Sequence, residues 1–209
     1  MSRGRFITVE GIEGVGKSTN IAYLTARLRE RGETVLTTRE PGGTPMAERI
    51  REMLLEHGDE PLPDIAELLL FFASRSLHIN NTIRPALEAG TWVICDRFTD
   101  ASRAYQGQGR RLGAERVEHL ARWVHEGLEP DLTLLLDAPA EIGMQRTAAR
   151  GGADRLDCEQ ASFYERVREA YLALAEAHPE RFVVIDASGS IEEVREAVDA
   201  AIERLYSDK

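Results

Sequence analysis

The sequence lacks the features of several large classes of protein. It has only two cysteines, Cys95 and Cys158, which lie far apart and outside any His/Cys cluster with zinc-site spacing. Cys95 falls in an apolar run, where it suits a small buried hydrophobic position. Basic residues are outnumbered, 26 Lys and Arg against 36 Asp and Glu, and the net charge of −10 argues against a general binder of nucleic-acid polymers. A small anionic ligand is not excluded, since it needs only a local cluster of arginines.

Long hydrophobic runs are also missing. No stretch approaches the roughly 20 apolar residues that cross a membrane. Residues 1–5 lead directly into a strand-like run and leave no room for a signal peptide. We therefore expect a cytoplasmic protein that does not act at a membrane. With 43% hydrophobic and 30% charged residues, the chain of 209 residues suits one globular domain, residues 1–209.

Five short apolar runs, rich in β-branched residues, alternate with helical patterns. The predicted strands are Phe6–Glu10, Thr34–Thr38, Trp92–Cys95, Leu132–Asp137 and Phe182–Asp186. The predicted helices are Lys17–Arg31, Pro45–His57, Asp64–Glu88, Ala114–Glu126, Ala140–Arg150, Glu159–Ala177 and Ile191–Tyr206. Strands that alternate with helices predict an α/β fold, a doubly wound five-stranded parallel sheet with helices on both faces. In such sheets, ligands bind outside the carboxyl ends of the strands.

A phosphate-binding pattern lies between the first strand and the first helix. G-x-x-x-x-G-K-[ST] is matched at every fixed position by Gly11-Ile12-Glu13-Gly14-Val15-Gly16-Lys17-Ser18. The glycines let backbone N–H groups turn toward phosphate oxygens, and the helix N-terminus adds partial positive charge. Lys17 can reach the β- and γ-phosphates, and the Ser18 hydroxyl can ligate Mg²⁺. The alternative is an ordinary Gly-rich turn. We expect a P-loop NTPase fold that binds ATP through these residues and Thr19.

An acidic residue ends the third predicted strand. Asp96 follows the run Trp92–Cys95, the form of a Walker-B element, and would hold Mg²⁺ directly or through water. The alternative is an aspartate that caps the next segment. Arg97 comes next and can clamp an anionic acceptor. A GTP switch is disfavoured because none of the asparagines, Asn20, Asn80 and Asn81, begins the guanine-reading pattern N-K-x-D.

Several motifs in register resemble the thymidylate (dTMP) kinase family. Its signature D-R-[YFH]-x-x-S-x-x-A-Y-Q is similar to residues 96–106, Asp-Arg-Phe-Thr-Asp-Ala-Ser-Arg-Ala-Tyr-Gln. Ala101 stands where the pattern has serine, with Ser102 next to it. Residues 39–44, Arg-Glu-Pro-Gly-Gly-Thr, and residues 70–75, Leu-Phe-Phe-Ala-Ser-Arg, match the bacterial form of the family. The resemblance runs from about Phe6 to the last helix.

The resemblance implies ATP-dependent phosphorylation of dTMP to dTDP, a step of dTTP synthesis, with Mg²⁺ as cofactor. Two alternatives stay open: a kinase for another nucleoside monophosphate or a deoxynucleoside, and a non-enzymatic nucleotide-dependent switch. A homodimer is also implied. The apolar third helix could supply both core and interface through Ile65, Leu68, Leu69 and Phe72.

The resemblance also assigns residues to the acceptor. Phe71 would stack on thymine and Arg75 would donate to its O4, and their spacing of four puts both on one helix face. Phe71 could instead be a core residue, because apolar residues surround it. Ser102 would read thymine N3, and Tyr105 would lie under the deoxyribose and leave no room for a 2′-hydroxyl. Arg39 and Gln106 complete this expected dTMP site.

A small arginine-bearing lid is the remaining expected part, at about residues 146–157. Arg146 and Arg150 share a helix face, Gly151 and Gly152 offer a hinge, and Arg155 follows. These arginines could instead only complement the helix C-terminus. Kinases of this class close such a lid over ATP, and Arg146 is expected to bind ATP.

One detail of the phosphate loop points to the bacterial subtype. Some relatives carry a catalytic arginine after the acidic residue of the loop, whereas Gly14 follows Glu13 here. The compensating charge is therefore expected from Arg150 and Arg155. Together with Lys17, Arg97 and Glu13, these form the predicted catalytic set. Glu13 is expected to face the acceptor 3′-hydroxyl or a bound arginine.

Overall fold

The fold is built on one parallel sheet. A computed structural model describes residues 3–56, 60–150 and 159–207. The sheet order is β2-β3-β1-β4-β5, and every pair of neighbouring strands is parallel. The strands are β1 (Phe6–Glu10), β2 (Val35–Arg39), β3 (Trp92–Asp96), β4 (Leu132–Asp137) and β5 (Phe182–Asp186). The predicted five-stranded parallel sheet is confirmed, with β2 shifted by one residue and β3 longer by one.

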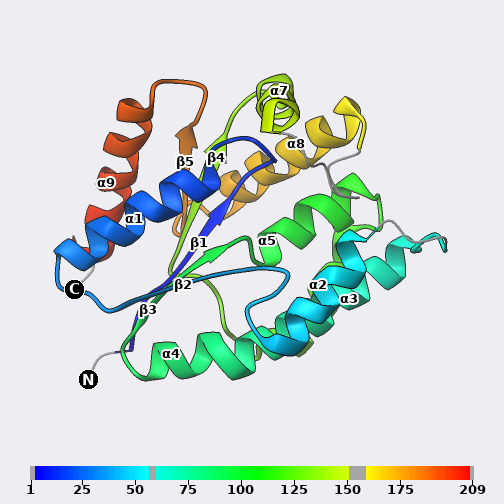
Figure 1. Cartoon of the computed structure of the whole chain (residues 1–209), viewed down its shortest axis with the longest axis horizontal. Coiled ribbons are helices and arrows are strands. Elements are labelled where there is room, and N and C mark those ends of the chain that lie inside the picture. Colours follow the sequence, from blue (N-terminus) through cyan, green and yellow to red (C-terminus); the bar gives the residue numbers. More distant parts are fainter. Residues whose placement is uncertain (1–2, 57–59, 151–158, 208–209) are drawn as a thin grey trace.

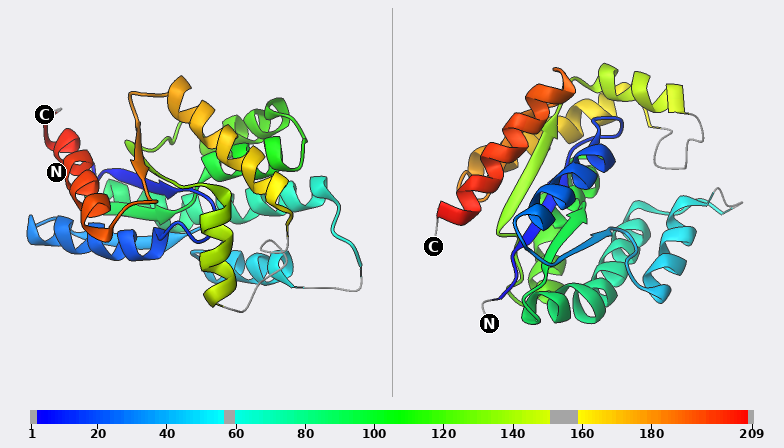
Figure 2. Two further views of the ribbon diagram at one scale, coloured as in Figure 1. Left: turned by 90° about the horizontal axis from the view of Figure 1, so that it is seen from above. Right: turned by 60° about the vertical axis from the view of Figure 1, so that its left-hand side comes forward.

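Helices cover both faces of the sheet (Figure 1). Side chains alternate along a strand, so Ile7 and Val9 of β1 pack in a cluster with helix α1, whereas Phe6 packs on the opposite face near α4. Helices α1 and α9 lie side by side on the first face (Figure 2). The helices are α1 (Lys17–Glu30), α2 (Pro45–Leu55), α3 (Asp64–His78), α4 (Arg84–Glu88), α5 (Thr99–Ser102), α6 (Ala114–His125), α7 (Ala140–Arg150), α8 (Ala161–Ala177) and α9 (Ile191–Ser207).

The helix predicted over Asp64–Glu88 is interrupted. A π-helical turn, η1 (Ile79–Ile83), separates α3 from α4, and the N–H of Arg84 donates to the carbonyl of Ile79. Pro85 is the physical reason, since its ring removes a backbone donor and crowds the carbonyl four residues earlier. The wider turn accommodates the proline without ending the helix.

A second helical segment was not predicted at all. Residues after β3 form α5 and then a π-helical stretch, η2 (Arg103–Gly109). Gly107 and Gly109 have poor helix propensity, but η2 packs closely against α8 and α6, and this tertiary packing overrides the local preference. The segment carries three of the expected acceptor residues, Ser102, Tyr105 and Gln106, so its helical form fixes their spacing.

Within the part of the chain that the structure describes, no helix is long and apolar enough to span a membrane. The carboxyl ends of β1, β3 and β4 meet at one edge of the sheet, where Val9 lies beside both Asp96 and Leu134. The phosphate loop leaves from that edge, as the rule for open α/β sheets requires.

Candidate active site

The phosphate loop joins β1 to α1 and depends on its glycines. Gly14 has φ 75° and Gly16 φ 91°, a left-handed conformation that only glycine adopts without steric cost. A Cβ atom on Gly14 would also lie 2.1 Å from the carbonyl oxygen of Gly143 in α7. Gly16 is the N-cap of α1, and no side chain of the described residues caps this end. The first N–H groups of the helix therefore face the space above the loop, where they can bind an anion.

Lys17 lies across the loop. Its Nζ donates to the carbonyl oxygens of Gly11 at 3.1 Å and Ile12 at 2.8 Å. Burial, and then the positive charge of Arg97, lower the pKa of Lys17 to about 8. A cation held this way gains most from an anionic ligand, which would favour its charged form.

One cavity collects the predicted residues. It has a volume of about 680 Å³ and opens between the phosphate loop, the end of β3, α3 and η2. The predicted site residues that line it are Glu13, Gly14, Gly16, Lys17, Ser18, Thr19, Arg39, Phe71, Arg75, Asp96, Arg97, Ser102, Tyr105, Gln106 and Arg146. Of the remaining loop residues, Gly11, Ile12 and Val15 are buried beneath it. Residues from five separate parts of the sequence thus share one space large enough for two ligands to meet.

Asp96 carries an unusual buried atom at the end of β3. Its Oδ1 is buried and has no hydrogen-bond partner among the described residues. A buried carboxylate oxygen without a partner is costly, unless a cation or water satisfies it. Ser18, on the first turn of α1, lines the same cavity. Oxygen donors of this kind fit Mg²⁺, although no cluster of three His, Cys, Asp or Glu side chains that could hold a metal occurs within the described ranges.

Arg97 is held beside the loop by an acid and an aromatic ring. Its Nη2 donates to Glu13 Oε1 at 2.6 Å, and its guanidinium carbon lies 4.7 Å from the centre of the Tyr105 ring. The Tyr105 hydroxyl donates to the other Glu13 oxygen at 2.7 Å. Glu13 therefore faces an arginine, one of the two partners expected for it. The arrangement orients Arg97 along one wall of the cavity.

The two adjacent phenylalanines of α3 have different environments. Phe72 is buried in a core cluster with Leu68 and Val117. Phe71 is only half-buried and lines the cavity. The packing therefore separates the aromatic residue that fills the core from the one that can stack on a base.

Arg75 lies almost fully buried at the back of the cavity, with 1% of its surface exposed. Its Nε donates to Glu40 at 2.6 Å, its Nη1 to the Ser102 hydroxyl at 3.1 Å and its Nη2 to the Phe98 carbonyl at 3.1 Å. Glu40 also accepts from the ring of His78. Although burial opposes it, the Arg75 charge and the His78 contact hold the pKa of Glu40 below its usual range. This network fixes Arg75 and Ser102 relative to each other.

Two other predicted acceptor residues have protein partners. Gln106 donates from Nε2 to the buried Glu67 at 2.9 Å, and Arg39 is half-exposed and pairs with Glu48 at 2.8 Å. Both line the cavity. Their roles toward a ligand stay predictions.

Three buried residues that shape the site were not among the predicted site residues: Glu10, Glu40 and Tyr171. Glu10 ends β1 and accepts from the backbone N–H of Phe98 and from the Tyr171 hydroxyl, each at 2.7 Å. Burial, and then the nearby Asp100 carboxylate, raise the pKa of Glu10 to about 7. An acid inside an apolar strand was the only available hint of such a role.

We predict a pH-dependent effect of Glu10→Gln on stability. The folded protein holds the Glu10 proton more tightly than the unfolded chain does. Protonation of Glu10 therefore adds its full contribution to the free energy of unfolding below pH about 4.5, and this contribution is lost as the pH rises through about 7. Between pH 5 and pH 8 the wild type is expected to lose roughly 2–3 kcal/mol relative to Glu10→Gln. Urea unfolding of both proteins at the two pH values measures this. The exposed change Glu30→Gln is the control. An equal difference in the free energy of unfolding between the wild type and Glu10→Gln at both pH values would contradict the assignment.

The predicted lid arginines fall partly outside the described residues. Arg146 lines the cavity and donates from Nη1 to the carbonyl of Ala187 at 3.2 Å. Arg150 ends α7, but its side chain and the whole of Arg155 lie outside what the structure describes.

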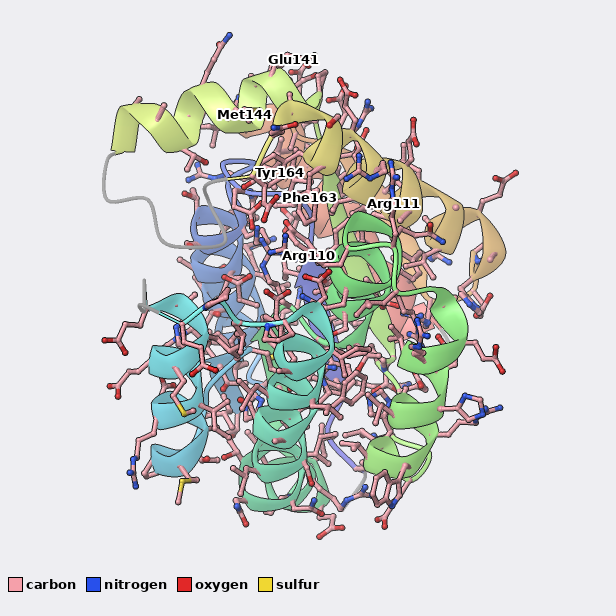
Figure 3. All side chains as sticks on the ribbon, turned by 90° about the vertical axis from the view of Figure 1, so that its right-hand side faces the viewer. Arg110, Arg111, Glu141, Met144, Phe163 and Tyr164 are labelled. Carbon is pink, nitrogen blue, oxygen red and sulfur yellow. The ribbon has the colours of Figure 1, made fainter. Side chains whose placement is uncertain are left out.

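Next to α7, Figure 3 shows Phe163 and Tyr164 of α8 close to Met144, with Arg110 over the Phe163 ring, 5.1 Å from its centre.

Comparisons with known proteins identify the family of this chain. The family model for thymidylate kinase matches residues 9–198. A thymidylate kinase of Pseudomonas putida (strain GB-1) is 54% identical over 199 residues, 95% of each chain. One from Chromohalobacter salexigens is 54% identical over 210 residues, 99% of each chain. The crystal structure of thymidylate kinase from Ehrlichia chaffeensis superposes with a TM-score of 0.79 at 32% identity, covering 97% of this chain and 99% of that one.

These matches extend over nearly the whole chain. The chain belongs to the thymidylate kinase family, whose members are nucleoside-monophosphate kinases that transfer a phosphoryl group.

Proposed function

We propose that this enzyme transfers the γ-phosphoryl group of ATP to dTMP, forming dTDP and ADP, as a step toward dTTP. The observation that carries the proposal is the single cavity in which the phosphate loop faces Phe71, Arg75, Ser102 and Tyr105, with Arg97 between them. A donor triphosphate on the loop and an acceptor nucleotide against α3 and η2 would meet at Arg97.

The chemistry needs little from an acid–base group. The acceptor phosphate has a second pKa of about 6, so it is mostly a dianion at neutral pH and is already a nucleophile. The barrier is electrostatic, because two anions must approach in line. Lys17 on the donor side and Arg97 on the acceptor side would supply positive charge where it develops in the transition state.

Mg²⁺ is the proposed cofactor, with Ser18 and Asp96 as its protein ligands. The support is the buried Asp96 Oδ1, which lacks a partner among the described residues, and the position of Ser18 on the same cavity. A bound Mg²⁺ would neutralise charge on the phosphate oxygens of ATP. Full activity in excess EDTA would contradict this.

Recognition of the acceptor nucleotide would follow from the hydrogen-bonding groups and the aromatic ring on the cavity wall. The half-buried Phe71 ring offers a flat apolar face to a base. Arg75 has five N–H groups, so those left after its bonds to Glu40, Ser102 and Phe98 can donate to a carbonyl such as thymine O4. The Ser102 oxygen can still accept from thymine N3–H, and Tyr105 would limit the space under the sugar.

An ADP-release assay with dTMP, dUMP, dCMP, dGMP, AMP and thymidine tests the function. We expect little ADP without an acceptor and the highest kcat/KM with dTMP. Stimulation by thymidine but not by dTMP would instead indicate a deoxynucleoside kinase. Slow hydrolysis that no acceptor changes would favour a nucleotide-dependent switch.

We also propose that the protein is a homodimer that pairs through α2 and α3. These helices contact each other and lie together on one side of the molecule (Figure 2). Leu68 and Phe72 face the core, but Ile65 and Leu69 of α3 are 44% and 52% exposed. Met46 and Met53 of the neighbouring helix α2 are 52% and 59% exposed. Exposed apolar side chains on two helices in contact favour an interface.

Leu69→Arg is therefore expected to convert a dimer into a monomer, because it places a charge in the proposed apolar interface. Light scattering after size exclusion measures the mass of each form. Val184→Arg is the control, since Val184 is 47% exposed on β5 at the edge of the sheet farthest from β2. A monomeric wild type, or a dimer that survives Leu69→Arg, would refute this interface.

We further propose that the whole chain works as one kinase domain with a lid at about residues 146–157. The family match over residues 9–198 supports one unit. Arg150 and Arg155 are its proposed catalytic arginines, and unchanged turnover in Arg150→Ala and Arg155→Ala would refute that role. The cytoplasmic location stays a prediction from the sequence.

A further inference from the structure

Arg97 occupies a backbone conformation that its surroundings must hold. Its φ is 67°, in the left-handed region that is strained for a residue with a side chain. Backbone hydrogen bonds secure it on both sides: the Arg97 N–H donates to the Val9 carbonyl at 3.1 Å, and the next N–H, that of Phe98, donates to Glu10 at 2.7 Å. A buried carboxylate on β1 therefore clamps the residue that follows Arg97.

The same carboxylate also reaches the side chain of Arg97 through a tyrosine. The second oxygen of Glu10 accepts from the hydroxyl of Tyr171 on α8 at 2.7 Å. The oxygen of that hydroxyl in turn accepts from Arg97 Nη1 at 3.5 Å. The Tyr171 ring also packs edge-on against Tyr105, with centroids 6.3 Å apart, and Tyr105 lies under the guanidinium. Three separate elements thus converge on one guanidinium.

Neither Glu10 nor Tyr171 lines the cavity formed by the described residues. Glu10 has no exposed surface and Tyr171 has 1%. They do not touch the space that a ligand would fill, so any effect on the reaction has to pass through the cavity residues that they contact, Arg97 and Tyr105. Burying a carboxylate costs folding free energy. The position of Glu10 at the base of Arg97 gives this buried group a function.

We propose that Glu10 and Tyr171 are positioning residues that hold the Arg97 guanidinium in the orientation in which it meets the acceptor phosphate. This inference rests on the proposed function, in which Arg97 binds that phosphate. Through these two residues, β1 and α8 would take part in acceptor binding, although neither residue lines the cavity.

Tyr171→Phe tests the inference, because it removes the hydroxyl and keeps the ring packing. We expect kcat/KM for dTMP to fall about tenfold, since a hydrogen bond to a charged group is lost, while KM for ATP stays within about twofold. Glu10→Gln is expected to act in the same direction, because Phe98 and Tyr171 donate to different oxygens of Glu10 and the NH2 group that replaces one of them cannot accept. Tyr23→Phe is the matched control: its hydroxyl also donates to a carboxylate, that of Asp199, but away from the cavity.

A double-mutant cycle separates positioning from a general structural role. In the Arg97→Ala background, Tyr171→Phe is expected to change kcat/KM for dTMP by less than about twofold, because the group that it positions is gone. The same tenfold loss in both backgrounds, or no loss in either, would overturn the inference. If the wild type and Tyr23→Phe transferred nothing to dTMP, the proposed function itself would fail, and this inference with it.

Discussion

Replacing Lys17 with methionine is expected to lower kcat about 10²–10³-fold, with folding intact. Methionine keeps an unbranched stem but removes the ammonium group that the loop holds over the site. Lys17 is the only lysine within the described residues, and its Nζ is already bonded to the carbonyls of Gly11 and Ile12. No other side chain of the loop can replace its charge at the transferred phosphoryl group.

The measurement is steady-state ADP release with saturating ATP and dTMP, together with a thermal unfolding curve. Arg27→Met is the matched control, since Arg27 lies on the same helix and pairs with Asp199 outside the cavity. A kcat within threefold of the wild type in Lys17→Met would show that the loop does not act as proposed.

Replacing Arg97 with alanine is expected to lower kcat/KM for dTMP about 10³-fold while KM for ATP changes little. The guanidinium lies on the acceptor side of the cavity, where Glu13 and Tyr105 orient it. Arg97→Lys is expected to recover only part of the loss, because an ammonium group cannot bind a phosphate through two parallel hydrogen bonds. Arg31→Ala is the control, since Arg31 follows the C-terminal end of α1, pairs with Glu203 and does not line the cavity.

The backbone conformation of Arg97 can be tested separately from the role of its side chain. With φ at 67°, glycine suits this position better than alanine. Arg97→Gly is therefore expected to be more stable than Arg97→Ala by about 1 kcal/mol, although both lack the guanidinium group. Equal loss of dTMP and ATP affinity in the alanine variant would argue that Arg97 supports the fold and not the acceptor.

Local patterns predicted the sheet and the phosphate loop because both depend on nearby residues. A buried parallel strand is a continuous apolar run, and the loop has fixed spacing between glycine and lysine. The helical form of residues 99–109 was missed because packing against other elements decided it. The π-helical turn before Pro85 was missed because the apolar period continues through the proline and does not show how the backbone widens around it.

The candidate site likewise combines residues that local patterns mark with residues that they do not mark. The residues that line the cavity lie in motifs, but the groups that hold them come from distant positions. Glu10 and Tyr171 are separated by 161 residues, and Glu40 and Arg75 by 35. No single-sequence pattern marks such pairs. The two readings of α3, core or base stacking, could be separated only once Phe72 was seen in the core and Phe71 on the cavity.

The transfer of label from [γ-³²P]ATP tests the central claim most directly. With dTMP present, we predict that the label appears in dTDP in a one-to-one ratio with ADP, and that omitting dTMP leaves almost all of it in ATP. Label released as inorganic phosphate at the same rate with or without dTMP would contradict the account.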